Sequence, residues 1–121
     1  MDKFRFLKWK VYEDAKRLLK EILFIVKKLP REYRYELGSQ IIRSVFSIIL
    51  NIAEGSGKTS DKELNRFFEI ALGSVSETVA GLDIFYDNGF IDQEEFNRLY
   101  ALLVGISNQI GGFKRKMNRV L

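Results

Sequence analysis

The chain has 121 residues and a formal net charge of +4, with 46% hydrophobic and 30% charged residues. This length and composition predict one globular domain spanning residues 1–121. Cysteine and histidine do not occur, which excludes disulfides, thiolate zinc sites, a cysteine nucleophile and the commonest general base. We therefore expect no catalytic residues, no metal and no cofactor.

The N-terminal segment does not resemble a targeting signal. Residues 1–10 are charged throughout and have no apolar centre, so a secretory signal peptide is not predicted. No apolar run approaches the roughly 20 residues that a membrane span requires. We expect a cytoplasmic protein that does not associate with a membrane.

The first predicted helix ends at the only proline, Pro30. Its apolar residues follow a 3-4 spacing and are Tyr12, Ala15, Leu19, Ile22, Val26 and Leu29. This spacing is typical of a helix that buries one seam. Proline cannot continue the helix because it lacks an amide hydrogen, so residues 31–36 are interpreted as a connection.

The second predicted helix, from about Leu37 to Glu54, is apolar around most of its circumference. The remaining polar stripe consists of Gln40, Arg43, Ser44, Ser47, Asn51 and Glu54. A helix that is apolar on most sides is usually buried on more than one side. In a small bundle, we expect another subunit to provide the additional burial.

Residues 54–60, EGSGKTS, resemble the end of a phosphate-binding P-loop. The complete motif has a glycine six residues before its lysine, and Ile52 occupies that position. The preceding residues show a helical period, whereas the motif follows a strand. We interpret the segment as a turn between two helices, with NTP hydrolysis at Lys58 as the alternative.

The third and fourth predicted helices each begin with a capping box. Ser60 precedes Glu63 by three positions, as Asp92 precedes Glu95. The third helix ends at Asn88-Gly89, where glycine supplies a left-handed cap. The predicted seams are Leu64, Phe68, Ala71, Val75, Thr78, Leu82 and Phe85, then Phe96, Leu99, Leu103, Ile106, Ile110, Phe113, Met117 and Val120. A bend of the fourth helix at Gly111-Gly112 is left open.

Four helices with short connections predict an all-α, antiparallel up-down-up-down four-helix bundle. Residues 1–35 contain eleven Lys/Arg and five Asp/Glu, residues 36–97 four and eleven, and residues 98–121 five and none. Because both chain ends lie at the same end of such a bundle, two basic segments should converge there. The predicted nucleic-acid-binding residues are Lys3, Arg5, Lys8, Lys10, Lys114, Arg115, Lys116 and Arg119.

A basic surface of this kind contacts phosphates without reading sequence. The cations of residues 3–10 also alternate with aromatic residues, which stack on unpaired bases. The alternative is a solvated surface whose cations only complement a helix dipole. The residues therefore favour binding of RNA or DNA, with a protein-interaction scaffold as the second hypothesis.

Residues 37–77 contain a further combination of elements. They are Gln40, Arg43 and Ser47, the run Asn51-Ile52-Ala53-Glu54-Gly55, and then Ser60, Arg66-Phe67, Ile70-Ala71, Gly73-Ser74 and Glu77. This combination resembles a bacterial family of small four-helix-bundle proteins encoded inside intervening sequences of large-subunit ribosomal RNA genes. The family is often labelled a ribosomal protein family. The sequence is also similar to the accessory protein of diversity-generating retroelements.

The resemblance implies a cytoplasmic, non-enzymatic homo-oligomer that forms a pentameric ring. It also implies nucleic acid and a reverse transcriptase as partners, since the retroelement relative binds both.

The polar residues of the second helix also suggest a role of their own. We predict a structural polar network or oligomer interface formed by Gln40, Arg43, Ser47, Asn51, Glu54 and Glu77. A buried Arg43 would pair with Glu54 or Glu77, because a buried arginine needs a carboxylate. The rival hypothesis is a carboxylate active site at Glu54 and Glu77, which no histidine, metal set or nucleophile accompanies.

Overall fold

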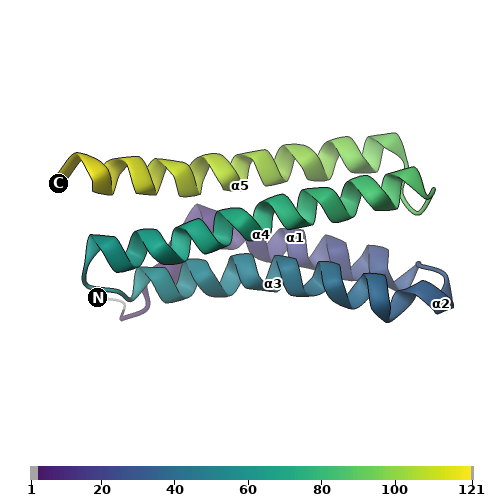
Figure 1. Ribbon diagram of the computed structural model, residues 1–121, viewed down its shortest axis with the longest axis horizontal. Helices are drawn as coiled ribbons and strands as arrows, with labels where there is room; N and C mark the ends of the chain where they lie inside the picture. Colours follow the sequence, from purple (N-terminus) through teal and green to yellow (C-terminus); the bar gives the residue numbers. More distant parts are fainter. Residues whose placement is uncertain (1–2, 121) are drawn as a thin grey trace.

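The computed structural model describes residues 3–120, and the side chains of residues 3–114. Within residues 3–120 the elements are η1 (Arg5–Lys8), α1 (Lys10–Lys27), α2 (Arg31–Arg34), α3 (Glu36–Ser56), α4 (Asp61–Asp87) and α5 (Gln93–Val120). The four long helices alternate in direction along the molecule (Figure 1). This arrangement confirms the predicted all-α, antiparallel four-helix bundle.

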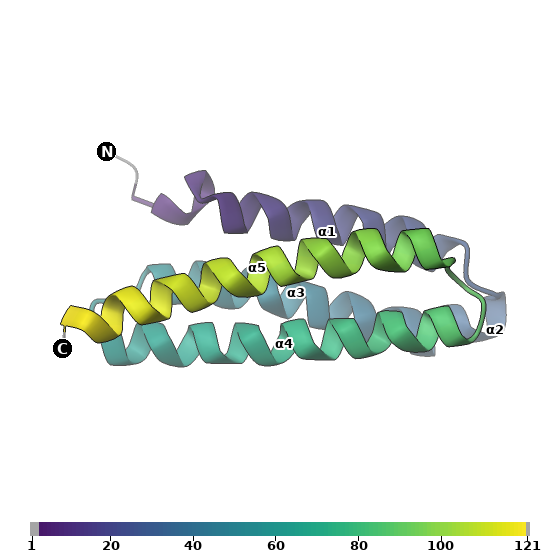
Figure 2. The same ribbon diagram turned by 90° about the horizontal axis from the view of Figure 1, so that it is seen from above.

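Each long helix packs against two others, so that the four enclose one core (Figure 2). α1 lies against α3 and α5, and α4 contacts the same two helices. Both chain ends lie at one end of the bundle, as predicted, and α2 lies at the other (Figure 1). Among the helices described, none is long and apolar enough to span a bilayer.

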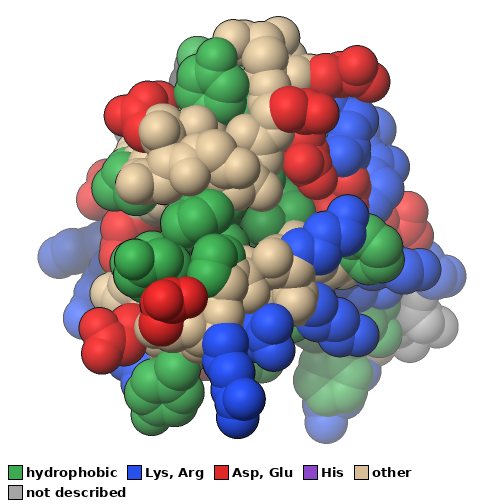
Figure 3. All heavy atoms as spheres, turned by 90° about the vertical axis from the view of Figure 1, so that its right-hand side faces the viewer, with side chains coloured by type: hydrophobic (Ala, Val, Ile, Leu, Met, Phe, Trp, Pro, Cys, Tyr) green, Lys and Arg blue, Asp and Glu red, His purple; other side chains and the backbone are tan. Residues whose placement is uncertain are grey.

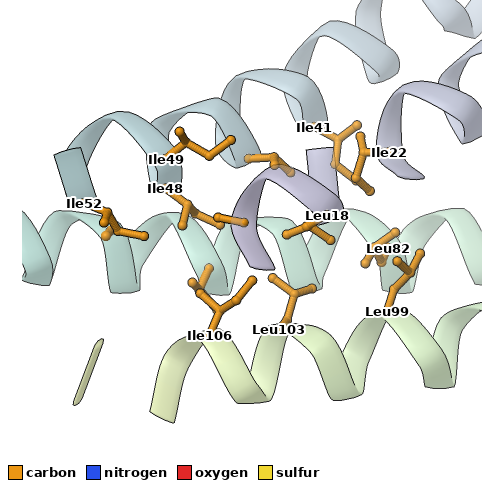
Figure 4. Close-up of a cluster of buried hydrophobic side chains, with 14 of the residues drawn as sticks. Leu18, Ile22, Ile41, Ile48, Ile49, Ile52, Leu82, Leu99, Leu103 and Ile106 are labelled. Carbon is orange, nitrogen blue, oxygen red and sulfur yellow. The ribbon is translucent and has the colours of Figure 1, made fainter. Parts of the chain in front are cut away.

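The core is a continuous cluster of aliphatic side chains with a few aromatic rings at its ends. Leu18 from α1, Ile48 from α3 and Leu103 from α5 point toward the same interior space (Figure 4). The predicted seam of α4 is confirmed, because all seven of its residues are buried. In α5 the predicted residues Leu99, Leu103, Ile106 and Ile110 are buried, whereas Phe96 and Phe113 pack at the edge of the core. Met117 and Val120 have side chains outside the described part of the chain.

The predicted seam of the first helix is confirmed at Ala15, Ile22, Val26 and Leu29, which are buried, and is wrong at two positions. Val11, Leu18 and Ile25 are buried, whereas Tyr12 and Leu19 are only half-buried. Both sets follow a 3-4 spacing, so periodicity alone does not separate them. Because α1 packs against both α3 and α5, the centre of its buried face is shifted by one residue toward the N-terminus relative to the predicted seam. The segment 31–36, predicted as a connection, contains the short helix α2 and the first residue of α3.

The predicted starts of α4 and α5 are confirmed by their capping hydrogen bonds. The Ser60 hydroxyl accepts a hydrogen bond from the Glu63 amide at 3.2 Å, and an Asp92 carboxylate oxygen accepts one from the Glu95 amide at 2.8 Å. Gly89 has φ +76°, the left-handed conformation expected after α4. α5 is helical through Gly111-Gly112.

α3 and α4 approach each other closely at Gly55. A Cβ atom there would lie 2.9 Å from Cε1 of Phe68 and 3.2 Å from Cβ of Phe67, so only glycine fits without displacement. Further along the same interface, the buried hydroxyls of Ser44 and Thr78 lie 2.8 Å apart. Each hydroxyl also lies within hydrogen-bonding distance of a carbonyl of its own helix. The pair has two protons for these three contacts, so one hydroxyl donates to the other while the second donates to its carbonyl, and both buried groups have a partner.

Candidate nucleic-acid interface

The basic end of the bundle is organised by Arg5 and Trp9. The Arg5 Nε donates a hydrogen bond to the carbonyl oxygen of Ser56 at 3.2 Å, and its guanidinium lies 5.4 Å from the ring centroid of Trp9. The Trp9 ring stacks on Phe113 with centroids 4.6 Å apart. Arg5 therefore ties η1 to α3, while Trp9 ties the start of α1 to α5.

A groove of about 550 Å³ lies between η1 and the end of α3. It is lined by Lys3, Phe4, Phe6, Leu50, Ala53, Glu54, Ser56, Gly57 and Lys58. The Phe4 ring is 56% exposed. An exposed ring in a groove that also contains lysines is a combination that contacts bases and phosphates of unpaired nucleic acid.

The other predicted cations at this end differ in their surroundings. Lys10 Nζ donates to a carboxylate oxygen of Asp14 at 2.8 Å, and Lys114 Nζ to one of Glu69 at 3.1 Å. Lys8 is exposed on η1. Arg115, Lys116 and Arg119 belong to α5, and their side chains lie outside the described residues. The backbone of both basic segments lies at the same end (Figures 1 and 2), whereas binding itself remains a prediction.

Asp14 is a site residue that the sequence did not reveal. It is 6% exposed, and its Oδ2 accepts hydrogen bonds from Lys10 Nζ at 2.8 Å and Gln109 Nε2 at 2.9 Å. Burial raises the pKa of Asp14, but these hydrogen bonds and the charges of Lys10 and Arg17 outweigh it, so the pKa lies below its ordinary value. The available signal was an acidic residue inside the apolar spacing of α1.

The predicted turn between the two helices is confirmed at residues 57–60, and the GSGKT segment does not form an open phosphate-binding loop. Gly55 and Ser56 are the last residues of α3. The amides of Gly57 and Lys58 donate to the carbonyls of Glu54 and Gly55 at 3.2 and 3.1 Å, whereas P-loop amides face the phosphates. Lys58 Nζ lies 3.3 Å from a Glu54 carboxylate oxygen and 5.2 Å from the ring centroid of Phe67.

The predicted polar network is present only around Ser47. The Ser74 hydroxyl donates to the Ser47 hydroxyl at 2.8 Å, and Asn51 Nδ2 donates to the Ser47 carbonyl at 2.8 Å. Arg43 is exposed instead of buried, because α3 turns its opposite arc to the core. No carboxylate lies within ion-pair distance of Arg43 among residues 3–114. The exposed members are Gln40, Arg43, Glu54 and Glu77, and a role in an oligomer interface remains a prediction.

The two carboxylates of the rival active-site hypothesis lie in different places. Glu77 lines a groove of about 140 Å³ with Gln40 and Ile84, whereas Glu54 lines the groove beside η1. Ser47 contacts Ser74, and Glu54 lies two helical turns beyond Ser47. At 1.5 Å per residue, the Glu54 backbone lies about 10 Å from Ser47 along the bundle. Glu77 follows Ser74 on the antiparallel helix α4, so its backbone is displaced from this contact in the opposite direction. The carboxylates therefore do not converge on one site.

The fold and the sequence pattern together define a small helical-bundle protein of a known family. Residues 8–112 match the family model described as 23S rRNA-intervening sequence protein. The chain belongs to this family.

Among solved structures, the chain is similar to a protein of unknown function of the S23 ribosomal protein family from Bacteroides thetaiotaomicron VPI-5482. The TM-score is 0.79 at 22% identity, over 86% of this chain and 97% of the other, and at that identity the similarity shows the fold alone. No curated protein matches the sequence.

Proposed function

We propose that this protein is a non-enzymatic, homo-oligomeric bundle of the cytoplasm that binds RNA or DNA without sequence specificity through its basic end. The observation that supports this proposal most strongly is the groove beside η1, whose lining includes Lys3, Lys58 and the exposed Phe4. Two basic segments from opposite ends of the chain lie at the same end of the bundle. The description of the family also links its members to ribosomal RNA.

The non-enzymatic part of the proposal is supported by the chemistry of the described residues. The amides of Gly57 and Lys58 are hydrogen-bonded to carbonyls, and Glu54 pairs with Lys58. Glu77 lies in a separate groove. Neither the lysine nor the carboxylates are accompanied by the base, nucleophile or metal set that a catalytic site combines.

The homo-oligomeric part is supported by the outer face of α3 and α4. Exposed aliphatic side chains accumulate on this face, namely Leu37, Leu50, Ile70 and Ile84. Gly73 lies among them, and a Cβ atom there would meet nothing within 4 Å. Packing inside the chain therefore does not require this glycine, although glycine costs about 1 kcal/mol in a helix interior. Close approach of a second subunit would explain both features, and the pentameric ring is implied by the family resemblance.

Salt-dependent titration tests nucleic-acid binding directly. The protein is titrated into labelled structured RNA and duplex DNA over a series of salt concentrations. A variant with Lys114, Arg115, Lys116 and Arg119 changed to glutamine, here named the terminal variant, should bind more weakly. Affinity falls as salt rises, and each lost phosphate contact should make the slope of log affinity against log salt less steep by about 0.9 for duplex DNA.

A matched pair of variants controls for net charge. Lys3→Gln with Lys8→Gln removes two exposed cations at the basic end, and Lys16→Gln with Lys20→Gln removes two exposed cations along α1. Arg5 is left unchanged because it holds η1 against Ser56. The proposal predicts weaker binding for the first pair only, and an equal loss for both pairs would argue against a localised surface.

A protein-interaction scaffold without a nucleic-acid role is the second candidate. It is favoured by the groove of about 140 Å³ between α3 and α4, which is lined mostly by apolar side chains. Light scattering of Gly73→Ala and Arg43→Glu tests whether this face joins subunits. Oligomers that persist in both variants, with no nucleic acid bound at low salt, would favour a scaffold that uses this groove for a different protein.

A further inference from the structure

The end of the bundle opposite the chain termini has a second cluster of aromatic and basic side chains. α1 ends at Lys27, Pro30 redirects the chain, and the four-residue helix α2 leads into α3. Tyr35 in this connection is 84% exposed, and Phe24 in the last turns of α1 is 61% exposed. Figure 3 shows this end, with hydrophobic and basic side chains gathered in its lower part.

The local structure holds this segment in place without covering the two rings. The Tyr33 ring lies 5.8 Å from Phe90, which itself packs 6.0 Å from the buried Phe85. The Arg34 guanidinium donates to the carbonyl oxygen of Leu29 at 3.2 Å. The segment is therefore anchored to the core on one side, while Tyr35 remains at the surface. An exposed ring on an anchored backbone loses little conformational entropy when another ring stacks on it.

The cations around these rings are not neutralised by neighbouring carboxylates. Lys27, Lys28, Arg31 and Arg34 are all exposed. No ion pair within 4 Å joins any of them to a carboxylate of residues 3–114, although Glu32 and Glu36 lie in the same segment. Lys28 Nζ instead lies 4.4 Å from the ring centroid of Phe24. Lys10 and Lys114 at the other end, by contrast, each contact a carboxylate.

We propose that residues Phe24, Lys27, Lys28, Arg31, Arg34 and Tyr35, here named the α2 platform, bind single-stranded RNA by stacking unpaired bases on the exposed rings. The proposal rests on the proposed nucleic-acid-binding function and adds a second surface with a different substrate. Duplex nucleic acid presents phosphates but keeps its bases stacked internally, so it would use the cations alone. Unpaired bases would use both kinds of side chain. The description of the matching family names a ribosomal RNA, and RNA is therefore the single strand that the proposal assigns.

Single substitutions of exposed rings test the platform in the full-length protein. Tyr35→Ala should weaken binding of a fluorescently labelled, mixed-sequence single-stranded RNA by about 5-fold or more, the order of magnitude for one stacked base. Tyr35→Phe retains the ring and should stay within about 2-fold of the wild type on the same basis. Phe24→Ala should also weaken binding. Tyr100→Ala, which removes an exposed ring on α5, is the matched control and should have no effect.

The terminal variant separates this proposal from the proposed function. If Tyr35→Ala and Phe24→Ala leave the affinity for single-stranded RNA unchanged while the terminal variant loses duplex binding, the platform is refuted and the proposed function stands. If Tyr35→Ala weakens binding and the terminal variant does not, the platform stands and the basic end fails. Wild-type protein that binds no nucleic acid refutes both.

Two further probes test the choice of partner. Single-stranded DNA of the same sequence and vesicles of phosphatidylcholine with phosphatidylglycerol are titrated in parallel. A loss that Tyr35→Ala causes with DNA or vesicles, but not with RNA, overturns the assignment to RNA. Circular dichroism melts accompany each variant, and unchanged melting is expected because Tyr35 is almost fully exposed.

Discussion

The contact at Gly55 gives a prediction whose magnitude follows from the structure. Gly55→Ala adds a Cβ atom 2.9 Å from Cε1 and 3.1 Å from Cδ1 of Phe68, and 3.2 Å from Cβ of Phe67. Phe68 is buried and cannot move without disturbing the core. Overpacking of this kind costs about 1–3 kcal/mol, whereas alanine gains about 1 kcal/mol over glycine in a helix.

A second glycine isolates the packing term. Gly105 lies in the interior of α5, and a Cβ atom there would meet nothing within 4 Å. Gly105→Ala should therefore stabilise the protein by up to about 1 kcal/mol. Gly55 is the second-last residue of α3, so alanine gains no more helix propensity there than at Gly105. The two variants should therefore differ in unfolding free energy by at least the overpacking cost of about 1–3 kcal/mol.

Urea unfolding followed by circular dichroism measures both variants at one protein concentration, because self-association would make stability depend on concentration. In thermal melts, 1 kcal/mol corresponds to roughly 4 °C for a chain of this size. Gly55→Ala should melt below Gly105→Ala by about 4–12 °C on that scale. If the two variants gained the same stability, the close approach of α3 and α4 at Gly55 would be refuted.

Three further predictions concern buried and motif residues. Asp14→Asn should cost about 1–3 kcal/mol at neutral pH, because a charged hydrogen-bonding group is lost. Since the folded-state pKa of Asp14 is lowered, this stabilisation is present above the unfolded pKa of about 3.9 and disappears as pH falls through the folded pKa. A gap between wild type and variant that stays constant in unfolding curves across this range would contradict it. Ser44→Ala and Thr78→Val should each cost about 1 kcal/mol, and the double variant less than their sum; full additivity would mean that the hydroxyls are not coupled. Calorimetry should detect no MgATP binding to wild type or Lys58→Ala, and binding lost in the variant would revive the nucleotide-site alternative.

Local sequence signals predicted the boundaries of α4 and α5 because the determining contacts are themselves local. Ser60 and Asp92 cap amides three residues away, and the left-handed conformation of Gly89 ends α4 two residues after Asp87. The buried arc of α1 was predicted only in part, since Val11 and Tyr12 belong to two overlapping seams with equal spacing. Only the positions of α3 and α5 decide between them.

The candidate site was less predictable, because charge in a sequence does not show which cations are already paired. Lys10 and Lys114 were predicted to contact nucleic acid, yet each lies beside a carboxylate. Asp14 is one helical turn from Lys10, and packing of α4 against α5 brings Glu69 to Lys114. Arg43 was expected to be buried because its helix is apolar on most sides, but a single chain leaves Arg43 exposed while Ser44 of the same stripe is buried. No binding role was predicted for Arg31 and Arg34, because the segment 31–36 was interpreted only as a connection.

The placement of both chain ends at one end of the bundle has a consequence for how the fold could be re-ordered. A linker across this end of the bundle could join α5 to η1, and the chain could be opened instead at Asn88-Gly89, where α4 meets the turn before α5. Such a circular permutant would begin with α5 and would convert the Asp14–Gln109 hydrogen bond from a long-range contact into one between consecutive helices. The bundle would keep its packing. The entropic cost of closing the α4–α5 connection would be removed, and the new connection between α5 and η1 would carry such a cost instead.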